Sequence, residues 1–169
     1  MSLKKLWKVS LISIIAVFML AACGSKDEGK GGSTENGLEK IKEKDKIVFG
    51  VKNDTRLFGL KNTSTGKVEG FDIDIAKALA KEILGDENKI ELVEVTSKTR
   101  VPLLQNGKID AVVATMTITE ERKKEVDFTD VYFNAGQSLL VKKGSKIKSI
   151  DDLKAGTKVI AVKGSTSAV

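Results

Sequence analysis

Short runs of apolar residues recur through the middle of the chain, separated by segments in which apolar positions repeat at helical spacing. Runs rich in β-branched residues predict strands, and they lie at 46–51, 89–95 and 109–115. The third run is apolar at nearly every position, which is typical of a strand covered on both faces. The order strand, helix, strand, helix, strand predicts an α/β fold with a parallel sheet and right-handed crossovers.

Two helices are predicted between these strands. In 71–85 the apolar residues recur every three or four positions, with Asp72 as the candidate cap and Gly85 as the stop. A shorter helix is predicted at 100–107, with a proline in its first turn. Before the first helix, polar residues and a glycine at 63–66 separate two apolar flanks, which predicts a hairpin.

The last part of the chain predicts two further strands, at 137–143 and 157–163. Between them, 149–155 has the pattern of one capped turn of helix. The second run leads toward the start of another helix just as the sequence ends. We therefore expect this chain to be a fragment of a longer protein or an interrupted gene product.

The first residues have the pattern of an export signal. Residues 1–22 combine a basic leader with an apolar core that is too short to span a membrane comfortably. Leu20-Ala21-Ala22-Cys23 follows and resembles the lipobox of bacterial lipoproteins, whose cysteine receives a diacylglycerol. We expect lipidation at Cys23, which anchors the protein on the extracytoplasmic face of the cell membrane. Residues 23–44, which begin with a glycine-rich polar stretch, are expected to form a flexible tether.

Composition and charge narrow the chemistry. The chain has no histidine and a single cysteine, which excludes intramolecular disulfides, His–Cys zinc sites and acid–base catalysis by histidine. We predict no metal, no cofactor and no enzymatic activity. Of the net charge of +6, three charges come from Lys4, Lys5 and Lys8, and the remaining lysines alternate with acids. This pattern is typical of a solvated surface and does not indicate nucleic-acid binding.

Ligands of open parallel sheets bind beyond the carboxyl ends of the strands. Several cations and hydroxyls follow the predicted strands closely, namely Lys52, Ser97, Arg100, Thr115, Thr117 and Arg122. Such a set favours an anion, because an arginine can hold a carboxylate through two parallel hydrogen bonds. Each cation taken singly is typical of a surface, and 117–120 also fits a capping box that only starts a helix. It is the shared location at strand ends that favours a binding site.

Three long segments carry a resemblance to a known family: "EGFDIDIAKALAKEI", "PLLQNGKIDAVVATMTITEERKKEVDFTDVYF" and "IKSIDDLKAGTKVIAVKGSTS". They resemble the polar amino-acid-binding proteins of bacterial ABC importers, solute-binding family 3, from about residue 46 to the last residue. The resemblance implies a two-lobed, type II periplasmic-binding-protein-like clamp. Lobe one would occupy 45–136 and be mostly present, whereas 137–169 would be the incomplete beginning of lobe two. It also implies a monomer whose partner is an ABC permease in the membrane.

The family's binding residues can be carried over by matching motifs. Arg122 resembles the arginine that pairs with the α-carboxylate of the ligand. Thr117, together with the backbone around Ala114 and Thr115, resembles the groups that hydrogen-bond to the same carboxylate. Thr166 resembles a contact that lobe two makes when the clamp closes.

The charges of the candidate residues indicate which amino acid is the ligand. With Arg122 assigned to the α-carboxylate, Lys52 and Arg100 remain for a second anionic group, because unpaired charge is costly to desolvate. We therefore favour glutamate, with aspartate or glutamine as alternatives. Two other functions use the same fold, the sensing domain of a signalling receptor and a dehydratase-like enzyme, and they are kept as alternatives.

Overall fold

A computed structural model describes residues 34–168 of the chain, and Glu35–Val169 forms one compact unit. Residues 1–33, which hold the predicted export signal and Cys23, the predicted lipidation site, lie outside the described residues. Among the helices that are described, none is both long and apolar enough to cross a membrane.

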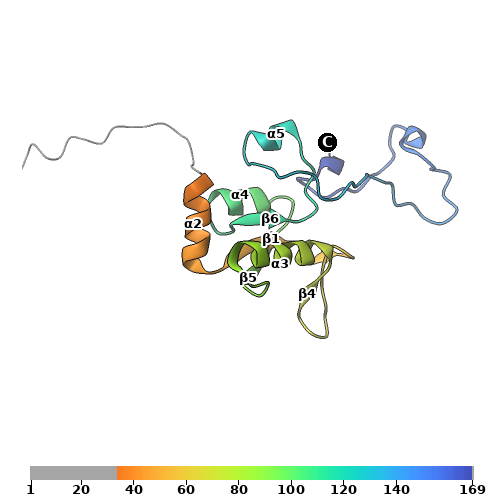
Figure 1. Cartoon of the computed structure of the whole chain (residues 1–169). Helices are drawn as coiled ribbons and strands as arrows, with labels where there is room; N and C mark the ends of the chain where they lie inside the picture. Colours follow the sequence, from red (N-terminus) through yellow and green to blue (C-terminus); the bar gives the residue numbers. More distant parts are fainter. Residues whose placement is uncertain (1–33, 169) are drawn as a thin grey trace, which may run out of the picture. The chain divides into compact units, whose positions relative to one another are not determined.

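The main sheet contains three parallel strands in the order β5-β1-β6 (Figure 1). These strands are β1 (Ile47–Val51), β5 (Ile90–Glu94) and β6 (Ala111–Val113). Val51 at the end of β1 lies opposite Glu94 of β5 and Val113 of β6. The carboxyl ends of all three strands therefore meet at one edge, as the sequence pattern predicts.

A small antiparallel sheet follows β1. Its strands are β2 (Asp54–Thr55), β3 (Gly59–Lys61) and β4 (Val68–Glu69), joined in that order. The hairpin predicted around 63–66 is confirmed, since it links β3 to β4. This sheet packs tightly on its surroundings, because a Cβ atom added to Gly59 would lie 2.3 Å from the carbonyl oxygen of Lys52.

Helix α3 (Phe71–Leu84) connects the hairpin to β5. It ends at Gly85, whose φ of 76° is the left-handed conformation that glycine adopts freely, so the predicted stop is confirmed. The predicted cap is wrong. Gly70 is the N-cap residue, and Asp72 lies inside the first turn, fully buried. A Cβ atom at position 70 would lie 2.4 Å from the carbonyl oxygen of Phe58, so the chain can pass here only as glycine.

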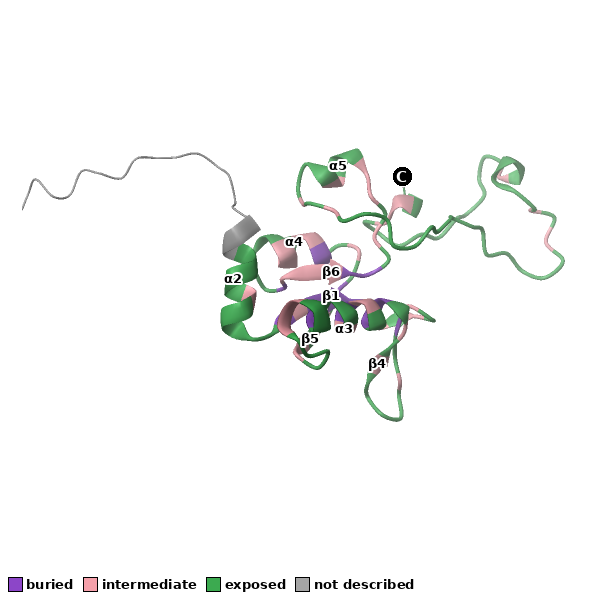
Figure 2. Ribbon diagram, in the orientation of Figure 1, coloured by how far each residue is buried: buried purple, intermediate pink, exposed green. Residues whose placement is uncertain are grey.

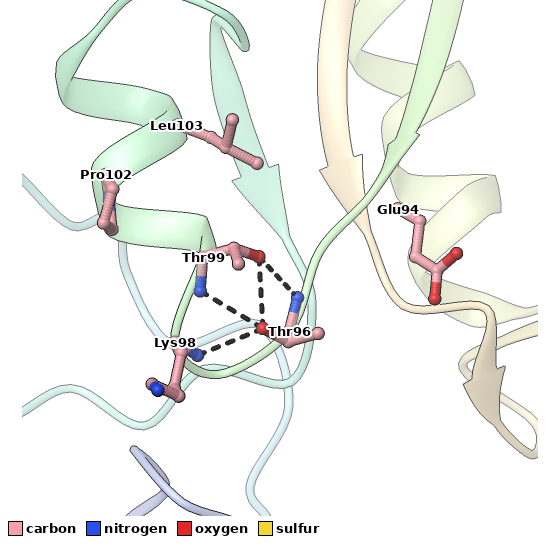
Figure 3. Close-up of a pocket in the computed structure, with 6 residues that line it drawn as sticks. All are labelled: Glu94, Thr96, Lys98, Thr99, Pro102 and Leu103. Atoms are coloured by element: carbon pink, nitrogen blue, oxygen red, sulfur yellow. Dashed lines mark hydrogen bonds between the residues drawn. The ribbon is translucent and has the colours of Figure 1, made fainter.

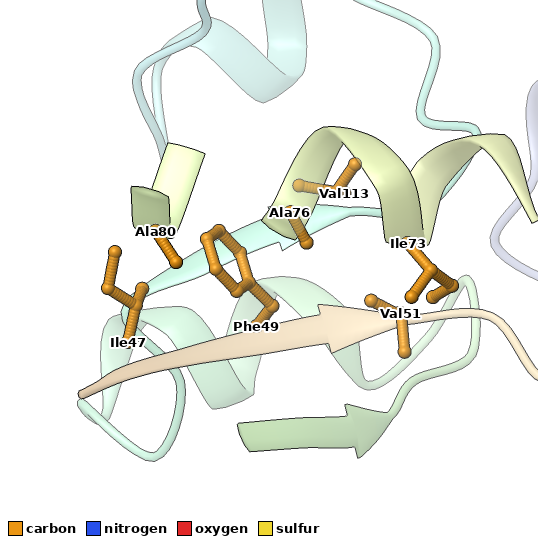
Figure 4. Close-up of a cluster of buried hydrophobic side chains, with 7 residues drawn as sticks. All are labelled: Ile47, Phe49, Val51, Ile73, Ala76, Ala80 and Val113. Carbon is orange, nitrogen blue, oxygen red and sulfur yellow. The ribbon is translucent and has the colours of Figure 1, made fainter. Parts of the chain in front are cut away.

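Hydrophobic side chains cover β1 on both faces. On one face, Ile47, Phe49 and Val51 pack with residues of α3 and β6, namely Ile73, Ala76, Ala80 and Val113 (Figure 4). The other cluster centres on Val95, Ile109 and Ala114, with Leu103 and Leu104 of α4 (Arg100–Gln105) packed against it. Burial of these apolar surfaces is the main contribution to the stability of the unit. Figure 2 shows the buried residues concentrated in β1 and the elements beside it.

Two local predictions differ from the structure. Part of the expected tether forms a helix, α2 (Thr34–Lys44), and its Ile41 packs against the core. The strands predicted at 137–143 and 157–163 are absent from the described residues, and Leu140 and Ile160 lie exposed. A strand needs a neighbouring strand to satisfy its backbone groups, and no described strand pairs with either run.

The turn predicted between those two runs is confirmed. It is a 3₁₀ helix, η1 (Ile150–Asp152), and Ser149 caps it in a reciprocal capping box with Asp152. The domain boundaries at 44/45 and 136/137 stay predictions.

Candidate functional site

The residues directly beyond the strand ends line one edge of the main sheet, here called the rim. Lys52 follows β1, Ser97 comes three residues after β5, and Ala114 and Thr115 follow β6. Their shared edge results from the parallel register of the three strands. The structure therefore brings these four predicted residues to the same end of the sheet.

Arg100 is a buried cation at this end of the molecule. It is the first residue of α4, only 3% exposed, and its Nη1 donates a hydrogen bond to the carbonyl oxygen of Ala114 at 3.0 Å. Its Nε has no hydrogen-bond partner in the described part of the chain. Burial, and secondarily the charge of Arg122, lowers the pKa of Arg100 to about 10. The two arginines are therefore near enough to repel each other.

Arg122 joins two parts of the chain that are distant in sequence. It lies in α5 (Glu120–Lys123), and its Nη1 donates to the carbonyl oxygen of Thr117 at 2.7 Å. Its Nη2 donates to the carbonyl oxygen of Gly164 at 3.1 Å. The N-cap of α5 is Thr119, whose hydroxyl accepts from the backbone amide of Arg122. The capping reading of 117–120 is thus corrected in one respect: Thr119 caps the helix, which leaves the Thr117 hydroxyl for other contacts.

The hydroxyl of Thr117 lies 3.3 Å from that of Thr166, the first residue of η2 (Thr166–Ala168). Gln137 also reaches Thr166, because its Nε2 donates to the hydroxyl at 3.0 Å. Gly164 packs on Ser97, since a Cβ atom added to that glycine would lie 3.3 Å from the Ser97 carbonyl oxygen. The segment 164–166 thus meets Ser97, Thr117 and Arg122.

Lys52 is the predicted site residue whose charge is already compensated. Its Nζ lies 3.0 Å from Oδ1 of Asp54, and the Lys52 side chain is 15% exposed against 66% for that of Asp54. The hydrogen bond from Lys52 lowers the pKa of Asp54 below its ordinary value. The carboxylate therefore stays ionised and balances the lysine at neutral pH.

Among the described residues, neither arginine has a carboxylate within ion-pairing distance, although hydrogen bonds and, less strongly, the charge of Arg122 lower the pKa of the exposed Glu121 carboxyl. Five ion pairs occur among the described residues, and each of them involves a lysine. Two neighbouring guanidinium groups without a carboxylate are electrostatically unfavourable unless an anion joins them. The arrangement is suited to hold a carboxylate.

Residues that sequence reasoning missed also lie near the site. The hydroxyl of Tyr132 donates to Oδ1 of Asp72 at 3.1 Å, so the segment after α5 is tied to α3. Gln137 and Gly164 contact predicted residues as described above. The sequence marks Asp72 as an acid near a helix start, a position that usually caps, and it contains no signal that the side chain is buried.

An open depression of about 410 Å³ lies at the start of α4, lined by residues adjacent in sequence to Ser97 and Arg100 (Figure 3). Its lining residues are Glu94, Thr96, Lys98, Thr99, Pro102 and Leu103. Thr96 and Thr99 satisfy each other there through hydrogen bonds that stabilise the turn before α4. None of the predicted binding residues lines this depression, and no cluster of acidic, cysteine or histidine residues suited to a metal ion occurs in the described part of the chain.

Fold and rim together define a class of protein: an α/β lobe with cations and hydroxyls at the carboxyl ends of its parallel strands, the edge where open α/β sheets bind ligands. Comparison with known families gives the particular family. Residues 47–167 match the model of the bacterial extracellular solute-binding proteins, family 3, and the chain belongs to this family. The predicted family is thereby confirmed, as is the prediction of a binding protein rather than an enzyme.

Two curated relatives are similar over nearly the whole chain. The ABC transporter glutamine-binding protein GlnH of Bacillus subtilis is 69% identical over 98% of this chain and 62% of its own length. The glutamine-binding protein of Geobacillus stearothermophilus is 62% identical over 99% of this chain and 70% of its own length. The chain therefore spans about two thirds of the length of these relatives.

Solved structures confirm the fold class. The arginine-bound form of truncated ArgBP from T. maritima superposes with a TM-score of 0.60 at 36% identity, covering 66% of this chain and 50% of that one. The arginine-bound form of domain 1 from TmArgBP, with a Phe57Trp mutation, superposes with a TM-score of 0.54 at 37% identity, covering 59% of this chain and 74% of that one. The described lobe is thus of the type II periplasmic-binding-protein kind predicted from the sequence.

Proposed function

We propose that this chain belongs to the binding component of an ABC importer, which captures a polar amino acid outside the cytoplasm and delivers it to a membrane permease. The observation that carries this proposal is the pair of neighbouring arginines, Arg100 and Arg122, without a carboxylate partner in the described residues. An α-carboxylate at this position would relieve their repulsion. The names of the two relatives support the same function.

The α-carboxylate is held by Arg122 in this proposal. Its guanidinium already spans from the Thr117 carbonyl to the Gly164 carbonyl, so it is fixed in place before a ligand arrives. Thr117 and Thr166 add hydroxyls that lie within 3.3 Å of each other. The backbone at Ala114 and Thr115 completes the group at the end of β6. A preorganised site loses little conformational entropy when it binds.

Glutamine is the ligand that we propose. The charge argument for glutamate needs Lys52 and Arg100 to be available for a second carboxylate. In the structure, Asp54 balances Lys52, and Arg100 is buried with one nitrogen committed to the Ala114 carbonyl. A neutral amide suits a rim whose lysine is already neutralised, and the two relatives described above are both glutamine-binding proteins.

Capture takes place through closure of a second lobe. The ligand binds lobe one, contacts segment 164–166, and shifts the population toward the closed form by its greater affinity for that form. That domain 1 of TmArgBP has an arginine-bound structure supports lobe one as the part that carries the primary contacts.

Anchoring is proposed to occur through Cys23, which lies outside the described residues. Two acyl chains on this cysteine would hold the protein at the outer face of the cell membrane. Mass spectrometry of the protein purified from membranes would show the mature N-terminus at Cys23 with its lipid adduct. A Cys23→Ser variant should be released into the soluble fraction, and retention of this variant in the membrane would contradict the anchor.

The binding function is tested by isothermal titration calorimetry of the protein with L-glutamine, L-glutamate and L-aspartate at neutral pH. We expect saturable binding of all three to be lost in Arg122→Ala, with glutamine the strongest ligand of the unaltered protein. Tighter binding of glutamate would show that Lys52 and Arg100 act on the ligand after all. No binding of any amino acid would refute the proposed function.

A further inference from the structure

Asp72 is a carboxylate that the proposed ligand contacts do not use. Its exposed fraction is 0%, yet its Oδ2 has no hydrogen-bond partner in the described part of the chain. Its Oδ1 accepts from the hydroxyl of Tyr132 at 3.1 Å, across 60 positions of sequence. Burying a carboxylate without compensation costs free energy. A buried carboxylate at the start of α3 therefore suggests that the side chain has a function.

Tyr132 lies in the segment that leaves lobe one. Aromatic contacts hold this segment against α3 and the hairpin, because the Phe58 and Phe133 rings lie 4.9 Å apart and the Phe71 and Tyr132 rings 6.1 Å apart. The Asp72–Tyr132 hydrogen bond adds a directional contact to these non-directional ones. It therefore sets where the segment leaves the lobe.

Thr115 is the third member of the cluster. Its φ of 46° lies in the left-handed region, which is unfavourable for a β-branched residue. Val113, two positions before Thr115, packs in the same buried cluster as Ile73, the neighbour of Asp72. The Thr115 amide also acts against burial, which raises the pKa of both Asp72 and Tyr132. Thr115 directly follows Ala114, whose carbonyl accepts from Arg100. The rim thus contains a strained residue next to the group that accepts from Arg100.

We propose that Asp72 is a positioning residue for the amino-acid site: its carboxylate holds Tyr132 and the Thr115 turn together, and so aligns the backbone that follows β6 with the two arginines. The inference rests on the proposed function, because it assigns a role in ligand affinity. It goes beyond the residues carried over from the family, none of which is Asp72 or Tyr132.

The test compares Tyr132→Phe, Asp72→Asn and the double variant with the unaltered chain. Tyr132→Phe removes one hydroxyl and keeps the aromatic contacts, so the fold should be preserved. The control is Asp74→Asn, an exposed acid two positions further along α3. Affinities for L-glutamine and L-glutamate are measured by calorimetry, and the backbone amide signals of Ala114, Thr115 and Thr117 by NMR.

We expect Tyr132→Phe and Asp72→Asn each to weaken binding by about fivefold, within the range over which residues away from a ligand modulate its binding. The double variant should be no weaker than the worse single variant, because both changes remove the same contact. The amide signal of Thr115 should shift in all three, whereas Asp74→Asn should leave affinity and signals unchanged.

A purely structural role would lower the melting temperature but leave the affinity of the folded protein and the Thr115 signal as they are, which would overturn the inference. Additive losses in the double variant would overturn it as well. If the unaltered chain binds neither probe, the proposed function fails and this inference fails with it. Unchanged affinity in the variants of a chain that does bind refutes this inference alone.

Discussion

Lys52 and Asp54 form an ion pair at the rim, with 3.0 Å between Nζ and Oδ1. The two residues are two positions apart, where the chain turns from β1 into the small antiparallel sheet. The lysine is the more buried partner. Its charge is therefore less screened by water and would act more strongly on a bound ligand. The acid thereby decides what charge the rim offers to a ligand side chain.

Removing this acid should change ligand preference. In Asp54→Asn the ammonium of Lys52 loses its partner and favours a second carboxylate. We expect the affinity ratio of glutamate to glutamine to rise by about fivefold, since partly exposed ion pairs are worth up to ~1 kcal/mol. Competition calorimetry with the two amino acids measures the ratio. Asp86→Asn, which alters an exposed acid just beyond the end of α3, serves as the control and should leave the ratio unaltered.

Arg122 should be the strongest single determinant of binding. Arg122→Ala removes a charge-assisted contact to the α-carboxylate, and we expect affinity to fall by about a hundredfold or more. The matched control is Lys123→Ala, which removes the neighbouring cation, paired with Glu120 on the helix surface at 2.9 Å. Calorimetry of both variants shows whether the loss of affinity is specific to the position of Arg122. Equal losses in the two would mean that net charge, rather than the position of Arg122, governs affinity.

Arg100 should contribute more to binding than to stability. Its side chain is desolvated and lies near a second arginine. Replacing it with an apolar residue of similar length removes the hydrogen bond to Ala114, but it also removes the desolvation cost and the repulsion by Arg122. For Arg100→Met we expect the free energy of unfolding to change by less than about 1 kcal/mol, while affinity falls by more than about tenfold.

Urea unfolding and calorimetry on the same Arg100→Met preparation test this prediction. Phe49→Ala is the reference for a true core residue, and it should lose about 3–5 kcal/mol. A loss of that size in Arg100→Met would show that the arginine is mainly structural.

Local pattern and topology were sufficient to predict much of the lobe. The β-branched runs became β1, β5 and β6, and Gly85 ends α3 because its left-handed conformation follows from chemistry that is visible in the sequence. The rule that parallel strands share a carboxyl edge then predicts from the sequence that Lys52 and Thr115 lie at the same edge of the sheet.

What the sequence could not predict depends on contacts between distant or flexible groups. The direction in which Lys52 points, toward Asp54 or toward a ligand, depends on its side-chain rotamer. The pattern of apolar and polar residues does not predict that rotamer. The burial of Asp72 depends on Tyr132, which lies 60 positions away. The apolar runs at 137–143 and 157–163 have strand composition, but strand formation requires a pairing partner, which the described residues do not supply.

The pKa of Asp72 predicts how this residue affects stability with pH. Burial is the largest cause and raises the pKa of the carboxyl above its ordinary value of 3.8, while the Tyr132 hydroxyl and the Thr115 amide oppose the change. The folded state therefore holds the proton more tightly than the unfolded state. The resulting stabilisation is fully present below pH 3.8 and is lost as the pH rises through the raised value.

The variant Asp72→Asn has no proton to release at this position. Its stability should therefore not decrease through this residue as the pH rises. Relative to the unaltered protein, its free energy of unfolding should increase as the pH is raised from 4 to 7. Urea unfolding at a series of pH values measures the difference, and Asp74→Asn gives the background from an exposed acid of the same helix turn. A difference that stays constant would show that Tyr132 and Thr115 only offset burial, and one that falls with pH would show that they outweigh burial and lower the pKa of Asp72. In that case Asp72 would be a stabilising residue at neutral pH, and its position beside the rim would carry no cost in stability.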